Sequence, residues 1–285
     1  MLKRLLNILS AAAIIICMTT CGKNRNESSK PMVAVSIAPL GNLVESICGD
    51  DYEIITLLDR GANPETFDPA MSKRAAAEKS DIYFMLDAFP FEKSVAGKRE
   101  NVIDVSTGVQ HLYGTHSHGD NEECHHEADP HIWTSGKNMK IIAHNIGEAM
   151  MKHYPENAGK YRIRLDSLIT VIDSLDNALT LKLNNAHPKS FAIWHPSLGY
   201  FAKDYGLKQI AVGEESKEIS PVRLKETINK AVADSVIVFF FQKEFDSRQA
   251  FSINEQLGAK MITIDPLAAD WMGQLDMITD ELTRQ

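Results

Sequence analysis

From Met32 onward, short apolar runs rich in β-branched residues alternate with stretches in which apolar residues recur every three or four positions. The runs are typical of strands and the stretches of amphipathic helices, so their alternation predicts an α/β architecture. Strands are expected at 33–38, 53–58, 81–86 and 101–105 in the first half, and at 191–194, 209–212, 236–241 and 261–264 in the second. Helices are expected at 41–47, 71–78, 198–205, 221–233, 248–257 and 272–282.

One segment between the two halves differs from the rest. Residues 155–185 carry a single glycine, Gly159, and a row of leucine and isoleucine residues at helical spacing: Leu165, Leu168, Ile172, Leu175, Leu179 and Leu183. A helix of about 30 residues spans about 45 Å, which is enough to run along a pair of domains. The segment holds fewer than three to four well-formed heptads, so a coiled-coil dimer is the alternative and we expect a monomer.

The long helix therefore divides the chain into two α/β lobes. We expect an N-terminal lobe at 31–154, a rigid linking helix at 155–185, and a C-terminal lobe at 186–285. A shorter helix, at 137–153, is expected directly before the linking helix.

The first 30 residues predict export. Lys3 and Arg4 precede an apolar stretch from Leu5 to Cys17, which is typical of a signal peptide at 1–20 and short of the roughly 20 residues of a membrane-spanning helix. Residues 18–22 resemble a bacterial lipobox with Cys21 as the lipidated residue, although Thr20 stands where Gly, Ala or Ser is usual. Residues 21–30 are then a polar, lipidated tether; an ordinary cleaved signal peptide is the alternative.

Composition narrows the class of protein. Hydrophobic residues make up 44% of the chain, enough for a large core, and the net charge of −8 comes without a basic cluster beyond the N-terminus. Nucleic acid is therefore not an expected partner. Cys48 and Cys124, the cysteines of the body, match no zinc-finger or redox spacing. Export permits a disulfide between them, and a buried thiol is the alternative for Cys48.

Four polar side chains stand beside prolines at expected strand ends or loop-to-helix junctions: Glu65, His131, His195 and Asp265. In open α/β sheets, ligands bind beyond the carboxyl ends of the strands. Two imidazoles and two carboxylates, one pair from each half, suit a divalent transition metal in the cleft between the lobes. Because the imidazoles must be neutral, affinity is expected to fall as the pH drops through about 6.5.

A second group of histidines lies in the polar loop 111–128, which has no apolar period. Acidic residues are mixed with them, and the five histidines are His111, His116, His118, His125 and His126. Short His-rich tracts bind metals weakly, so this loop is expected to be an auxiliary collector of metal. A solvated acidic loop is the alternative.

Together these segments resemble the zinc/manganese-binding cluster of ABC-transporter solute-binding lipoproteins, with the zinc-binding type most similar. The resemblance is carried by Asp129–Trp133, His195–Leu207 and Asp265–Leu267, together with the His-rich loop and the long helix. It implies two lobes joined by a rigid helix, metal in the interlobe cleft, and a periplasm-facing protein that docks onto a membrane permease. The implied function is capture and delivery of zinc, without catalysis.

The segment Gly61–Pro69 departs from that family's pattern, Gly-x-x-Pro-His-x-Tyr/Phe-Glu/Asp-Pro, by placing Glu65 where the first histidine ligand is expected. A shell of two histidines and two carboxylates is also what manganese-binding members use, and carboxylate oxygen suits harder ions. By resemblance, His195 and the His-rich loop favour zinc. Manganese and iron remain alternatives.

Two other classes of function are open. An exported zinc hydrolase would use Glu65 as a general base on metal-bound water, although the chain lacks His-Glu-x-x-His and Gly-x-Ser-x-Gly motifs. An adhesin would use the metal to stabilise its fold, but the chain offers no binding repeat in support.

Overall fold

The computed structural model describes residues 30–113, 128–213, 220–245 and 247–284. The described residues from Met32 onward belong to one compact unit, which is called the main unit below. The predicted signal peptide, the Cys21 lipidation site and four of the auxiliary histidines (His116, His118, His125 and His126) lie outside the described residues.

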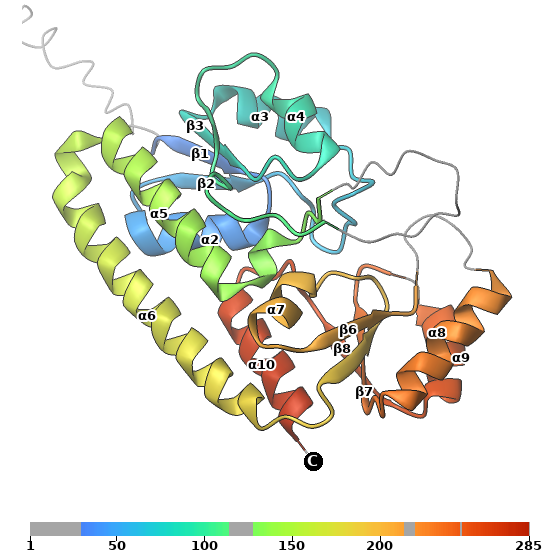
Figure 1. Ribbon diagram of the computed structural model, residues 1–285. Helices are drawn as coiled ribbons and strands as arrows, with labels where there is room; N and C mark the ends of the chain where they lie inside the picture. Colours follow the sequence, from blue (N-terminus) through green and yellow to red (C-terminus); the bar gives the residue numbers. More distant parts are fainter. Residues whose placement is uncertain (1–29, 114–127, 214–219, 246, 285) are drawn as a thin grey trace, which may run out of the picture. The chain divides into compact units, whose positions relative to one another are not determined.

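Two parallel four-stranded sheets organise the main unit (Figure 1). The first has the order β2-β1-β3-β4, with β1 at Met32–Val35, β2 at Glu53–Thr56, β3 at Ile82–Met85 and β4 at Val102–Asp104. The second has the order β6-β5-β7-β8, with β5 at Ser190–Ile193, β6 at Lys208–Ala211, β7 at Val238–Gln242 and β8 at Lys260–Ile264. The repeated order confirms the predicted pair of α/β lobes.

Helices cover the sheets close to where the sequence predicts them. They are α2 (Ala38–Cys48), α3 (Met71–Lys79), α5 (Gly136–His153), α7 (Gly199–Asp204), α8 (Pro221–Ala233), α9 (Ser247–Leu257) and α10 (Trp271–Thr283). Because helices bury both faces of a parallel sheet, the inner strands β1, β3, β5 and β7 are rich in apolar residues, and all five positions of β7 are buried.

Helix α4 (Pro90–Ala96) is not among the predicted helices. It is too short for a helical period to show, and it depends on a buried carboxylate. Glu92 Oε1 accepts a hydrogen bond from the Leu86 backbone N–H at 2.9 Å, and Oε2 accepts from those of Ala88 and Phe89 at 2.8 and 2.9 Å. Glu92 thus accepts from the N–H of Phe89, the N-cap residue of α4, and from two N–H groups of the segment before it.

The predicted linking helix is present as α6 (Ala158–Asn184), whose 27 residues span about 40 Å. A 3₁₀ turn at Pro155–Asn157 precedes it. Figure 1 shows α6 running beside both halves, packed on α2 and α5 at one end and on α10 at the other. Its buried face consists of Tyr161, Leu165, Leu168, Ile172, Leu179 and Leu183.

One hydrophobic cluster runs through both lobes, from Val33 in β1 through Leu165 in α6 to Phe240 in β7. Near the strand ends, the Trp133 indole Nε1 donates to the Pro266 carbonyl oxygen at 2.9 Å and so joins the two halves of the chain. This shared core fixes one lobe against the other. The lobe limits 31–154 and 186–285 stay predictions.

Cys48 is a buried free thiol among the described residues, and burial raises its pKa to about 12. Cys124 lies outside the described residues, so the disulfide that export permits is not tested. In the part of the chain that the structure describes, no helix is long and apolar enough to cross a membrane.

Two substitutions in α6 test the shared core. Leu165 is fully buried, whereas Ile163 on the opposite face is 70% exposed. Leu165→Ala is expected to lower the free energy of unfolding by about 2–5 kcal/mol, since it leaves a cavity. Ile163→Ala is expected to change it by no more than about 0.5 kcal/mol. Urea denaturation measures both; equal effects would contradict the role of α6 as a packed link.

Candidate metal centre

Three of the four sequence-predicted ligands meet at one place. Glu65, His131 and His195 present one donor atom each, and all three atoms lie within 4.8 Å of one another. His131 Nε2 is 3.0 Å from His195 Nε2, Glu65 Oε1 is 3.4 Å from His195 Nε2, and Glu65 Oε1 is 3.8 Å from His131 Nε2. Both histidines are buried, and Glu65 is partly buried.

These separations suit a single small cation. Zinc binds nitrogen and oxygen at about 2.0–2.2 Å, and tetrahedral ligands at that radius lie about 3.3–3.6 Å apart. The observed triangle, with sides of 3.0, 3.4 and 3.8 Å, brackets that range. Three donors occupy three corners of a tetrahedron and leave a fourth for another group.

Asp129 orients the His131 ring. Its Oδ1 accepts a hydrogen bond from the His131 backbone N–H at 2.9 Å and lies 2.8 Å from ring Nδ1. Because a carboxylate can only accept, Nδ1 carries the proton and Nε2 presents its lone pair to the cluster. The chain is shaped for this by Pro130 and by the 3₁₀ turn η1 (Ile132–Thr134) that begins directly after His131.

Gln242, the last residue of β7, holds the backbone around His195. Its Oε1 accepts from the His195 N–H at 3.2 Å, and its Nε2 donates to the His195 carbonyl at 2.5 Å and to Ser197 Oγ at 2.8 Å. Phe245 stacks on the imidazole with ring centroids 5.3 Å apart. Since β5 and β7 are neighbours in the sheet, His195 is fixed at the carboxyl ends of both strands.

Glu65 comes from the loop that follows β2. The Asn63 side chain accepts a hydrogen bond from the Glu65 N–H at 2.9 Å, and the Thr66 N–H donates to the Asn63 carbonyl at 3.3 Å. This Asx turn, next to Pro64, aims the carboxylate at the two imidazoles. A carboxylate therefore takes the place of the histidine that the resemblance implies.

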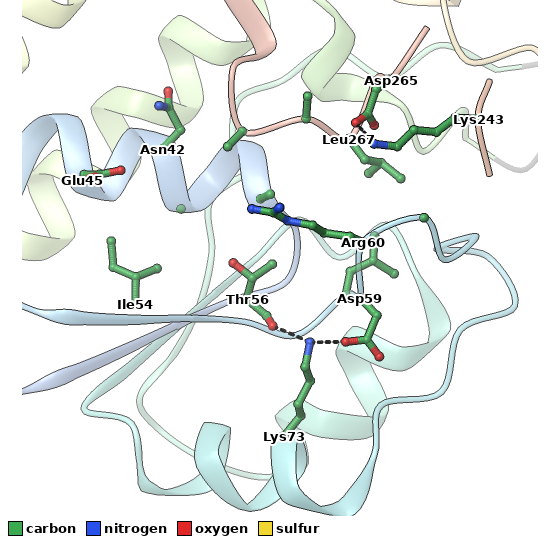
Figure 2. Close-up of a pocket in the computed structure, with 16 residues that line it drawn as sticks. Asn42, Glu45, Ile54, Thr56, Asp59, Arg60, Lys73, Lys243, Asp265 and Leu267 are labelled. Carbon is green, nitrogen blue, oxygen red and sulfur yellow. Dashed lines mark hydrogen bonds and ion pairs between the residues drawn. The ribbon is translucent and has the colours of Figure 1, made fainter. Parts of the chain in front are cut away.

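Asp265, the fourth predicted ligand, does not belong to this group of three. Its Oδ2 forms an ion pair with Lys243 Nζ, and its backbone N–H donates to Gln274 Oε1 at 2.9 Å. Figure 2 shows the Asp265 and Lys243 side chains side by side at the edge of a cavity of about 600 Å³. Its role as a ligand stays a prediction.

A second carboxyl group near the imidazoles, that of Glu244, is not among the predicted ligands. Glu244 lines a small pocket together with His131, His195 and Pro266. Burial raises its pKa to about 7, and the nearby Asp265 carboxylate adds to the rise. A signal was available, because the apolar run of β7 ends abruptly in Gln242, Lys243 and Glu244, three polar residues at the carboxyl end of a strand.

Of the auxiliary histidines, His111 lies within the described residues. It is exposed and lies outside the group of Glu65, His131 and His195. The collecting role of the loop 111–128 stays a prediction.

The sequence matches a protein family over residues 33–284, under the description "ZnuA: Zinc-uptake complex component A periplasmic". One relative, the zinc-binding lipoprotein AdcA of Streptococcus pneumoniae (strain ATCC BAA-255 / R6), is 24% identical over 277 residues, which are 92% of this chain and 55% of AdcA. The chain thus spans about half the length of that relative. The high-affinity zinc uptake system protein ZnuA of Bacillus subtilis (strain 168) is 25% identical over 94% of this chain and 90% of its own.

Solved structures agree with the sequence comparison. A crystal structure of ZnuA superimposes with a TM-score of 0.80 at 27% identity and covers 89% of this chain and 98% of its own. A zinc-bound ZnuA deletion mutant gives a TM-score of 0.79 at 27% identity, with 90% and 99% covered. The periplasmic zinc-binding protein TroA of Treponema pallidum, at 17% identity and a TM-score of 0.78, has the same fold. The sequence match over nearly all of the main unit shows that this chain belongs to the ZnuA family of periplasmic zinc-uptake components.

Proposed function

We propose that this chain captures extracytoplasmic zinc between its two lobes and delivers it to the permease of an ABC-type importer. The observation that carries the proposal is the triangle of Glu65 Oε1, His131 Nε2 and His195 Nε2, with sides of 3.0–3.8 Å. Two imidazoles and one carboxylate are zinc ligands, and Asp265 is the candidate for the fourth corner. Zinc is the cargo in this proposal and not a catalytic cofactor.

Delivery to a membrane is supported by the N-terminal sequence and by the family. A polar segment of about ten residues after Cys21 would keep the main unit close to a membrane whose permease receives the metal. We therefore infer a lipid anchor at Cys21, a periplasm-facing location and a monomer. The loop 111–128 would raise the local concentration of zinc beside the tighter site.

The exported-hydrolase alternative depends on the same geometry. Catalytic zinc sites keep one position open for water, whereas a transport site needs none. In the proposed site Glu65 is a ligand, so it is not a free general base. The family description, which names zinc uptake, supports transport over catalysis.

Manganese is the second candidate cargo, and the observation that favours it is Glu65. A carboxylate oxygen in place of an imidazole nitrogen makes the shell harder, and harder shells favour manganese relative to zinc. The two buried imidazoles keep zinc as the first choice.

The geometry of the site predicts which histidine substitutions weaken zinc binding. His131→Ala and His195→Ala each remove one of three clustered donors, so each is expected to weaken zinc binding by about 100-fold or more, beyond the 10- to 100-fold typical of outer-shell changes. Competition with a chromophoric chelator measures the affinity of the metal-stripped protein. His144→Ala, a change on the exposed side of α5, is the matched control and should leave affinity unchanged. Wild-type affinity in both cluster variants would place the metal site elsewhere.

Glu65 predicts the metal preference. Glu65→His gives the shell a third imidazole, so the ratio of zinc affinity to manganese affinity is expected to rise by about tenfold. Glu65→Gln, which keeps the shape but removes the charge, should weaken binding of both metals. The same chelator competition measures both ions, and an unchanged ratio in Glu65→His would mean that Glu65 does not contact the cargo.

A further inference from the structure

Lys243 and Asp265 occupy equivalent positions just beyond two paired strands. Gln242 of β7 pairs with Ile264 of β8, and the Lys243 N–H donates to the Ile264 carbonyl at 3.2 Å. The parallel register therefore brings the next residue of each strand side by side at the carboxyl edge of the sheet. Figure 2 shows the Lys243 ammonium reaching the Asp265 carboxylate.

The backbone of Asp265 is fixed independently of this ion pair. Its N–H donates to Gln274 Oε1 of α10 at 2.9 Å, and the next carbonyl, that of Pro266, accepts from Trp133 Nε1 at 2.9 Å. Pro266 and Leu267 line the small pocket that also contains both imidazoles. The backbone thus lies at the metal centre, and the direction of the Asp265 carboxylate is set by its side-chain torsions.

Lys243 differs from the other lysine in the same cavity. Lys73 Nζ pairs with Asp59 at 2.7 Å and also donates to the Thr56 and Leu57 carbonyls at 2.9 and 2.8 Å, so three groups hold it in place. Among the described residues, the Lys243 ammonium has Asp265 as its one ion-pair partner. Its side chain is 44% exposed and can move into solvent when that partner leaves.

We propose that Lys243 is a positioning residue that holds Asp265 away from the Glu65–His131–His195 cluster, so that a bound metal must take this carboxylate from the ammonium. This inference rests on the proposed function. A metal gains the oxygen donor only by breaking the ion pair, which lowers its affinity. This loss of affinity is larger for manganese, which prefers oxygen ligands, than for zinc, which binds well to the two imidazole nitrogens.

The same exchange assists release. When a docked permease opens the cleft, Lys243 recaptures the carboxylate, and one metal ligand is withdrawn without a charge being left unpaired. Partly exposed ion pairs are individually weak, so the effect on affinity is expected to be about three- to tenfold.

Chelator competition on the purified full-length protein tests the proposal with zinc and with manganese. Lys243→Met is expected to tighten zinc binding about threefold and manganese binding about tenfold, whereas Lys243→Arg should stay near the wild type because it keeps the ion pair. In the Asp265→Ala background, Lys243→Met should change nothing. Lys260→Met is the matched control, because it breaks the Lys260–Glu281 pair at the other end of β8.

A spectroscopic readout shows whether Asp265 is a ligand of the bound metal. The visible spectrum of bound Co²⁺ reports its ligands, so Asp265→Ala should alter the spectrum of the saturated protein, whereas Lys243→Met should leave it unchanged, because the metal takes the same carboxylate in both proteins. Unchanged metal affinity in Lys243→Met, or tightening that persists without Asp265, would overturn the proposal. Absence of one-to-one zinc binding by the wild-type protein would instead refute the proposed function itself.

Discussion

Two imidazole nitrogens 3.0 Å apart, one from each half of the chain, make the placement of the two lobes the constraint on which the metal centre depends. A shift of one lobe by about 1 Å would move the donor atoms away from the separations of about 3.3–3.6 Å that tetrahedral zinc ligands have. The shared core opposes that shift, because α6 packs on α2 and α5 in one lobe and on α10 in the other. The hydrogen bond from Trp133 to Pro266 adds a fixed point close to the cluster.

Residues next to the candidate ligands orient them for coordination. Asp129 fixes the tautomer of His131, and Gln242 holds the main chain on both sides of His195. Each acts through hydrogen bonds to a buried histidine, and hydrogen bonds to buried groups are costly to lose. Asp129 and Gln242 therefore hold the two histidines in the positions that coordination requires.

Much of the fold could be predicted from the sequence because its signals are periodic. The apolar runs of the strands and the leucine row of α6 are repeated features, and both correspond to buried surfaces. Helix α4 could not be found in this way, since Glu92 stabilises it through contacts that have no period.

The candidate site also has residues that could be predicted from the sequence and residues that could not. Ligands of open α/β sheets bind beyond the carboxyl ends of the strands, and this rule predicted that Glu65, His131 and His195 lie close together. The structure places their donor atoms within 4.8 Å of one another. The partner of Asp265 could not be foreseen, because Lys243 is distant in sequence and becomes a neighbour only through the pairing of β7 with β8. Glu244 was missed although it satisfies the same rule, since no proline or motif marks it.

The most direct measurement is the anomalous scattering of zinc in crystals of the zinc-loaded protein, recorded on both sides of the zinc absorption edge. We expect one strong peak between the lobes, about 2.0–2.2 Å from His131 Nε2, His195 Nε2 and a Glu65 oxygen. A strong peak held by other residues, with none among these three side chains, would contradict it.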